Sequence, residues 1–188
     1  RDTIKRYVFK PLMHSDRFSW LSTSDINLIM NQYMDFDPTF KFLGTFPSDI
    51  IQLYGETRLR QQIEECRNYK KIALVFNLDT SKKIGSHWVC VYINNNGGPE
   101  ERTCEYFDSL GQAPSYLINK YLLLWAESPR YDLEFVVTSH PFQKQGAECG
   151  VYVIYYILNR ILGYSIDEIL SDSINDTNMN YYRNLLYN

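Results

Sequence analysis

The apolar positions of the chain first recur at i, i+3, i+4 and i+7, which is the spacing of an amphipathic helix. They are Ile26, Ile29, Met30 and Tyr33, and they follow a cluster of helix N-cap candidates at residues 22–25. The next segment, residues 35–47, is interrupted by proline and glycine and is predicted to be a loop. Residues 49–68 are predicted to be helical.

Four short runs rich in β-branched and aromatic residues predict strands. They cover residues 71–78, 87–93, 103–108 and 134–138, and the sequence NNNGGP between the second and the third predicts a turn. Helices are predicted at residues 115–127, 149–162 and 178–187. The helix at 149–162 is apolar on nearly every side, which predicts that it runs through the core. No repeat or linker divides the chain, so we expect one α+β domain over residues 1–188, with its core from about residue 20.

Composition and charge exclude several classes of protein. With 45% hydrophobic and 22% charged residues over 188 positions, the chain matches an ordinary globular domain. No apolar run approaches the length of a membrane span, so no membrane partner is expected. The net charge of −3 and the absence of a basic block disfavour nucleic acid as a partner. The 16 tyrosines, together with many isoleucines and asparagines, are as compatible with an AT-rich genome as with selection on the fold.

The four cysteines, Cys66, Cys90, Cys104 and Cys149, contain no CxxC pair. With only three histidines, a zinc site would need scattered ligands, so no metal or organic cofactor is expected. A core of this size does not need disulfides either, which predicts a reducing, intracellular compartment. The chain begins at Arg1 rather than methionine, so we expect it to be a segment excised from a longer protein.

A hairpin between the second and third predicted strands would bring a histidine and an aspartate together. If its turn is centred on the Gly-Gly dipeptide, paired residues have numbers that sum to about 195, and His87 lies opposite Asp108. Directly opposed side chains share a face with Cβ atoms roughly 4.5–5.5 Å apart, within hydrogen-bonding reach. The same register places Cys90 and Cys104 on opposite faces. A β-bulge would shift this register, and the pair by itself is more typical of an ordinary strand end and turn.

Cys149 supplies a third group, at the first turn of the predicted apolar helix. The unpaired N–H groups and the dipole of a helix N-terminus favour a thiolate. A histidine base and a carboxylate that orients it complete the set needed by a cysteine nucleophile. Gln143 can donate its side-chain N–H to an oxyanion together with the Cys149 amide. Alone, a cysteine here is more often a buried structural residue, so the prediction depends on the whole set.

Other combinations of cysteine and histidine are weaker. Cys104 with His140 follows the chain order of papain-like enzymes, but Cys104 is predicted in mid-strand, away from a helix terminus. Cys66 is predicted on a polar, exposed helix. His14 and His140 have no evident carboxylate partner and are expected to be structural or surface residues.

The ordered set of motifs resembles the superfamily of ubiquitin-like-specific proteases and adenovirus proteinase (adenain). The motifs are HWV at residues 87–89, YFDSLG at residues 106–111, and Gln143 six residues before Cys149-Gly150. Trp20-Leu21 resembles the Trp-Leu motif near the start of that catalytic domain. Within the superfamily, the chain is most similar to processing proteases of large DNA viruses, through residues 41–44, 76–80, 85–88, 105–107, 148–150 and 179–186.

The resemblance implies an α+β fold in which helices pack on a mixed central β-sheet and the nucleophile lies at the N-terminus of a buried helix. It implies His87 as general base, Asp108 as the group that orients it, Cys149 as nucleophile and Gln143 as oxyanion donor. Two departures stand out: Glu148 replaces the aspartate usual in the cellular deconjugating enzymes, and the interval from histidine to aspartate is longer. Both weaken the expectation of a SUMO-type substrate.

The resemblance also assigns substrate contacts to Trp20, Trp88 and Gly146. The two indoles would wall a tunnel that admits only a Gly-Gly or Gly-X-Gly type of sequence before the scissile bond. Without the resemblance, the same tryptophans would be interpreted as ordinary buried aromatics, and that alternative stays open.

We therefore expect a cysteine endopeptidase that cuts after glycine in a protein substrate. The sequence leaves two substrates open, a ubiquitin or ubiquitin-like conjugate or precursor, and a viral polyprotein. An alternative from another class is a catalytically weak module that binds glycine-rich or ubiquitin-like C-terminal tails. If viral, the protein would act in the host cytoplasm, the nucleus or the virion.

Overall fold

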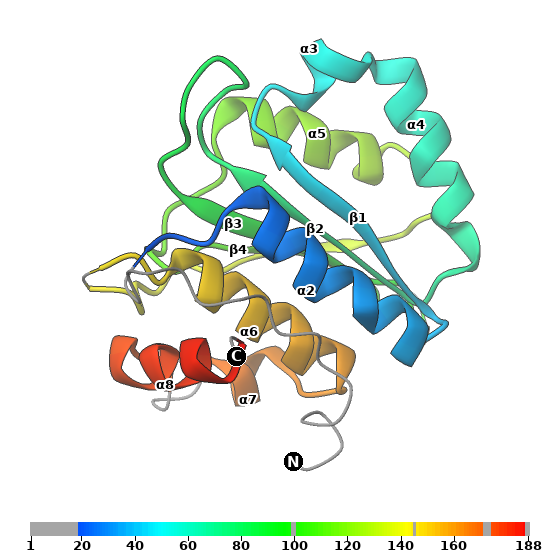
Figure 1. The fold of residues 1–188 in the computed structure, drawn as a ribbon. Helices are drawn as coiled ribbons and strands as arrows, with labels where there is room; N and C mark the ends of the chain where they lie inside the picture. Colours follow the sequence, from blue (N-terminus) through cyan, green and yellow to red (C-terminus); the bar gives the residue numbers. More distant parts are fainter. Residues whose placement is uncertain (1–18, 99–100, 145, 171–173, 187–188) are drawn as a thin grey trace.

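A five-stranded sheet in the order β1-β2-β3-β4-β5 lies at the centre of the computed structural model (Figure 1). The structure describes residues 19–98, 101–144, 146–170 and 174–186. The strands are β1 (Phe40–Pro47), β2 (Lys71–Asn77), β3 (Trp88–Asn94), β4 (Thr103–Phe107) and β5 (Glu134–Val137). The two outer pairs are parallel and the two inner pairs antiparallel, so the sheet is mixed, as predicted.

Helices cover both faces of this sheet (Figure 1). One face carries α2 (Thr23–Phe36) and α6 (Cys149–Ile161), and α7 (Ile166–Ile169) and α8 (Asp176–Leu186) pack against α6. The other face carries α3 (Ile50–Tyr54), α4 (Glu56–Glu65) with the 3₁₀ turn η1 (Cys66–Asn68), and α5 (Tyr116–Ala126). Among the described residues, no helix is both long and apolar enough to cross a membrane.

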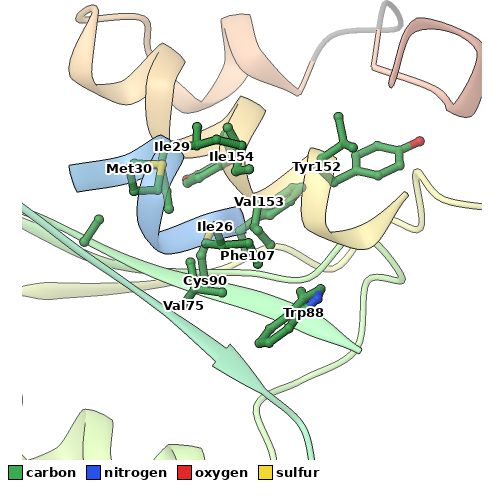
Figure 2. Close-up of a cluster of buried hydrophobic side chains, with 14 of the residues drawn as sticks. Ile26, Ile29, Met30, Val75, Trp88, Cys90, Phe107, Tyr152, Val153 and Ile154 are labelled. Carbon is green, nitrogen blue, oxygen red and sulfur yellow. The ribbon is translucent and has the colours of Figure 1, made fainter. Parts of the chain in front are cut away.

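The core consists of one hydrophobic cluster on each face of the sheet. On the α6 side, Cys90 and Phe107 from the strands meet Ile26 of α2 and Val153 of α6 (Figure 2). Because α6 lies between the sheet and α8, nearly all of its surface is buried, which explains its all-round hydrophobicity. Cys104 belongs to the cluster on the α5 side, so Cys90 and Cys104 lie on opposite faces, as predicted.

Residues 40–47 form a strand, and the prediction of a loop there was wrong. Phe40 and Phe42 are buried and pair in parallel with β2, after which the register shifts. Gly44 lies at this irregularity with a φ of 117°, a backbone conformation that favours glycine. Pro47 ends an edge strand, where proline is tolerated. Glycine and proline here mark an irregular edge strand rather than a loop.

The predicted helical region 49–68 is interrupted at Gly55, which has a φ of 78° and separates α3 from α4. Cys66, which was predicted to be exposed, is buried against the α5 side of the sheet. The polar sequence around it hid the fact that Leu59, Ile63 and Cys66 share one buried face at helical spacing. His14 lies outside the described residues.

Candidate active site

His87 and Asp108, just beyond paired ends of β3 and β4, are in direct contact. His87 Nε2 and Asp108 Oδ1 are 2.6 Å apart, and both side chains are buried. The predicted register was off by two, because Cys90 pairs with Phe107 and paired numbers sum to 197. His87 and Asp108 are therefore diagonal rather than directly opposed neighbours. A shift of two residues preserves the alternation of faces, which is why the predicted contact still forms.

A tight turn fixes the Asp108 carboxylate. Its Oδ1 atom also accepts a hydrogen bond from the backbone N–H of Leu110 at 2.8 Å, and the N–H of Gly111 donates to the Asp108 carbonyl at 2.9 Å. Gly111 has a φ of 68°, and a Cβ atom there would lie 2.7 Å from the carbonyl carbon of His140. Glycine is therefore required for the turn to pack against the loop that leads to Cys149.

Cys149 is the first residue of α6, and its side chain interacts electrostatically with His87. Burial alone would lower the pKa of His87, but the interactions with Asp108 and Cys149 raise it from 6.5 to about 9. Because Nε2 faces Asp108, Nδ1 is the ring nitrogen left for the thiol. The raised pKa favours the imidazolium form of His87 at neutral pH, beside the Cys149 side chain at the N-terminus of α6.

The other three cysteines are poorly suited to be nucleophiles. Burial raises the pKa of the Cys66 thiol to about 11, and it raises the pKa values of Cys90 and Cys104 well above their usual range. The alternative pair of Cys104 and His140 does not form. Cys104 is enclosed on the α5 side of the sheet, whereas His140 is exposed and packs edge-on against Phe142.

Gln143 lies in the loop before α6, and Ser109 holds its amide. Ser109 Oγ donates to Gln143 Oε1 at 2.7 Å, and Gln143 Nε2 donates to the carbonyl of Gly146 at 3.1 Å. The Ser109 carbonyl accepts from the backbone N–H groups of Phe142 and Gln143 at 2.8 and 2.9 Å. Because Ser109 occupies the oxygen end of the amide, its N–H end stays on the side of Gly146 and the nucleophile loop, as an oxyanion donor requires. Sequence reasoning did not single out Ser109, although it belongs to the DSLG turn.

The two predicted tunnel residues differ in their surroundings. Trp88 is 6% exposed and belongs to the core cluster of Figure 2, and its Nε1 atom donates to the carbonyl of Leu21 at 2.8 Å. Trp20, the neighbour of Leu21, is 46% exposed and is therefore no ordinary buried aromatic. Gly146 has a φ of 81°, which favours glycine at that position.

A buried arginine that the sequence did not reveal borders this site. Arg183 of α8 donates from Nε to Glu148 Oε2 at 2.7 Å, from Nη1 to the Ser19 carbonyl at 2.6 Å, and from Nη2 to the Ala147 carbonyl at 2.8 Å. Two of these acceptors lie in the residues just before Cys149, and the third lies in the residue just before Trp20.

The geometry brings a thiol at a helix N-terminus, a histidine with a raised pKa, a buried carboxylate and an oriented amide into one place. These are the groups of a cysteine peptidase, in which the thiolate attacks a carbonyl and amide donors hold the oxyanion. No group of three or more histidine, cysteine, aspartate or glutamate side chains within the described ranges is arranged to hold a metal ion.

Comparison with known proteins narrows this class to a family. The sequence profile of the Ulp1 protease family, C-terminal catalytic domain, matches residues 3–188. The chain belongs to the Ulp1 protease family and is of the cysteine peptidase type.

The similar proteins include viral ones. R355 of Acanthamoeba polyphaga mimivirus, named as a thiol protease, is 33% identical over all of this chain and 63% of its own length. The SUMO-1 cysteine protease S273R of African swine fever virus, from a Kenyan pig isolate, is 29% identical over 74% of this chain and 52% of its own length. The chain thus spans less than two thirds of these relatives.

Solved structures confirm the fold. The crystal structure of the African swine fever virus pS273R protease superposes with a TM-score of 0.78 at 19% identity, covering 96% of this chain and 72% of the other. The Xanthomonas campestris effector XopD, solved bound to ubiquitin, gives a TM-score of 0.53 at 16% identity over 94% of this chain and 93% of its own.

Proposed function

We propose that residues 1–188 form one catalytic domain that hydrolyses a peptide or isopeptide bond after a glycine-rich sequence in a protein substrate. The observation that carries this proposal is the buried 2.6 Å contact between His87 and Asp108, next to a thiol at the N-terminus of α6. A module that only binds glycine-rich tails would have no use for a buried carboxylate that raises the pKa of a histidine beside a cysteine.

In the proposed mechanism, His87 holds the proton of Cys149 on its ring, and the thiolate attacks the carbonyl carbon of the glycine that precedes the scissile bond. Gln143 and the Cys149 amide donate hydrogen bonds to the resulting oxyanion. His87 then gives its proton to the leaving amine, which leaves an acyl group on the sulfur. Water deprotonated by His87 releases that group and restores the thiol, while Asp108 keeps the ring oriented.

The enclosure of Cys149 favours glycine in the substrate. Cys149 is only 2% exposed, and the segment that carries Trp20 is hydrogen-bonded to Trp88 through Leu21. Leu21 also packs directly on the residue after the nucleophile, because a Cβ atom at Gly150 would lie 2.9 Å from the Leu21 side chain. A substrate that reaches such a thiol in extended form is best accommodated when it carries no side chains.

Two kinds of protein substrate remain candidates, a viral polyprotein and a ubiquitin-like conjugate. The names of S273R as a SUMO-1 protease and of XopD as bound to ubiquitin describe those proteins and support the second candidate by analogy. The likeness to viral proteases supports the first. We propose that the chain belongs to a viral protein and that a viral polyprotein is its primary substrate. Glu148 stands where the cellular deconjugating enzymes have aspartate, which weakens the case for a SUMO-type substrate.

A panel of fluorogenic substrates tests the proposal. We expect cleavage of peptides with Gly-Gly before the reporter and a loss of about tenfold or more in kcat/KM when either glycine becomes alanine, because each added Cβ must enter the enclosed site. Ubiquitin and SUMO-1 with the same reporter, tested in parallel, distinguish the two substrate classes.

The control is Cys149→Ala, which should abolish cleavage and keep the thermal unfolding midpoint of the wild type. Cleavage by Cys149→Ala at the wild-type rate would contradict the proposal. Equal cleavage of Gly-Gly and Ala-Ala peptides by the wild type would contradict it as well.

A further inference from the structure

The Arg183 guanidinium joins three segments that converge on the nucleophile. It is 3% exposed, and each of its three nitrogen atoms donates to a different acceptor, on Glu148, Ala147 and Ser19. Only a planar fork with several fixed N–H directions satisfies three acceptors in this way, since an ammonium group is a single compact point.

The first consequence concerns the charge next to Cys149. Glu148 directly precedes the nucleophile and is buried, so an unpaired carboxylate there would oppose a thiolate. The 2.7 Å ion pair with Arg183 compensates that charge. The glutamate that departs from the family pattern is therefore matched by an arginine on α8.

The second consequence concerns the loop before α6. Asp176, the first residue of α8, accepts the backbone N–H of Lys144 at 3.0 Å and the hydroxyl of Tyr152 at 2.8 Å. Arg183, two turns further along α8, holds the same loop at Ala147. Helix α8 thus holds this loop at two positions between Gln143 and Cys149.

The third consequence concerns Trp20. Arg183 holds the carbonyl of the residue before it, Ser19, while Trp88 holds the carbonyl of the residue after it, Leu21. The backbone on both sides of Trp20 is thereby anchored to groups at the nucleophile, although the indole itself is half-exposed. Position and exposure together are what a substrate wall needs.

We propose that Arg183 is a positioning residue that fixes Trp20 relative to the nucleophile turn, and so sets the selectivity for glycine-rich substrates. This inference rests on the proposed function, because the role of Trp20 in substrate selection belongs to it. Arg183 itself touches neither substrate nor reacting atoms.

The test compares Arg183→Lys with a matched control, Arg160→Lys. Arg160 is also a largely buried arginine, bonded through two nitrogens to Glu105 and through the third to the carbonyl of Tyr164. It lies eleven residues along α6 from Cys149, about 16 Å at the rise of an α-helix. Both variants keep the positive charge beside their glutamate.

Each variant is combined with Trp20→Ala, and kcat/KM is measured on a Gly-Gly peptide. We expect Trp20→Ala to cost about tenfold in the wild type and in Arg160→Lys, but about twofold or less in Arg183→Lys, because residues that act through one another are not additive. Equal costs in all three backgrounds would overturn the proposal.

Acrylamide quenching of tryptophan fluorescence gives a readout that needs no substrate. Trp88 and Trp125 are buried, so quenching reports mainly on Trp20. Arg183→Lys should raise the quenching constant and Arg160→Lys should leave it unchanged; an unchanged constant in Arg183→Lys contradicts the proposal. If the wild type cleaves no glycine-rich substrate, the proposed function fails, whereas quenching still decides whether Arg183 positions Trp20.

If Arg183→Lys does not fold, the double variant Glu148→Gln with Arg183→Met takes its place in both measurements. It removes the two charges together, and replacement of a complete buried ion pair is often tolerated. The same outcomes are expected, because this variant also releases the Ser19 carbonyl.

Discussion

Ser109 shows how one hydroxyl can determine the orientation of a candidate catalytic group. Its Oγ atom donates to the oxygen of the Gln143 amide, and both side chains are buried. Without that donor, the amide could turn its oxygen toward a developing oxyanion, which would repel it. If Gln143 is the oxyanion donor, as proposed, Ser109 is the residue that positions it, and it is carried by the same turn that positions Asp108.

We predict that Ser109→Ala lowers kcat by about 10–100-fold with little change in KM, because the oxyanion forms only after substrate has bound. Ser109→Thr should restore most of the rate, since it keeps the hydroxyl. Steady-state kinetics of both variants on a Gly-Gly peptide check this. A loss carried by KM, or no rescue by threonine, would contradict the assigned role.

The candidate site residues differ in how far the sequence could reveal them. His87, Asp108, Gln143 and Cys149 were predicted together, because their residue types suit a cysteine nucleophile with its base and their order and spacing resemble those of the ubiquitin-like-specific protease and adenain superfamily. Their roles await the experiments above. Arg183 was missed because its partner Glu148 lies 35 residues away. The sequence did contain an indication of its burial. Arg183 lies four residues after Met179 and three before Leu186, on the buried face of α8.

Helices and central strands were predicted correctly where the apolar residues follow a single helical or strand period. The apolar run of α6 and the strands β2, β3 and β4 appear within a few residues of their predicted ends. Strand β1 was missed because an edge strand with a glycine at its irregularity and a proline at its end looks like a loop. The glycine and the proline indicate an irregular backbone, but local composition does not show that the segment pairs with β2.

The β3–β4 hairpin shows what spacing alone can decide. Its register differed by two from the prediction, because loop geometry, which the sequence did not show, sets the centre of the connection. The parity of the register was right, so the contact of His87 with Asp108 and the separation of Cys90 from Cys104 were both anticipated. Face alternation is thus more predictable than exact pairing.

At the scale of the whole molecule, the raised pKa of His87 links the site to stability. The pKa of this group is about 9 in the folded chain and close to 6.5 when unfolded, because folding buries it beside Asp108 and Cys149. A raised pKa stabilises the fold below the unfolded value and loses that contribution as the pH rises through the folded value. The contribution is at most about 3 kcal/mol.

We predict that the free energy of unfolding falls between pH 6.5 and pH 9 in the wild type, and falls less steeply in Asp108→Asn. Groups that do not interact with His87 contribute equally to both proteins, so the difference reports on His87 and its partners. Urea unfolding at several pH values measures it. Parallel curves for the two proteins would show that Asp108 does not raise the pKa of His87.

The central claim is that Cys149 is the nucleophile of a site built to accept glycine. Intact-protein mass spectrometry after incubation with a peptide ending in a glycine vinyl ester tests this most directly, because the electrophile replaces the scissile carbonyl. We expect one covalent adduct per chain, mapped to Cys149 and lost in Cys149→Ala. An adduct on Cys66, Cys90 or Cys104, or the absence of any adduct on the folded wild-type chain, would contradict it.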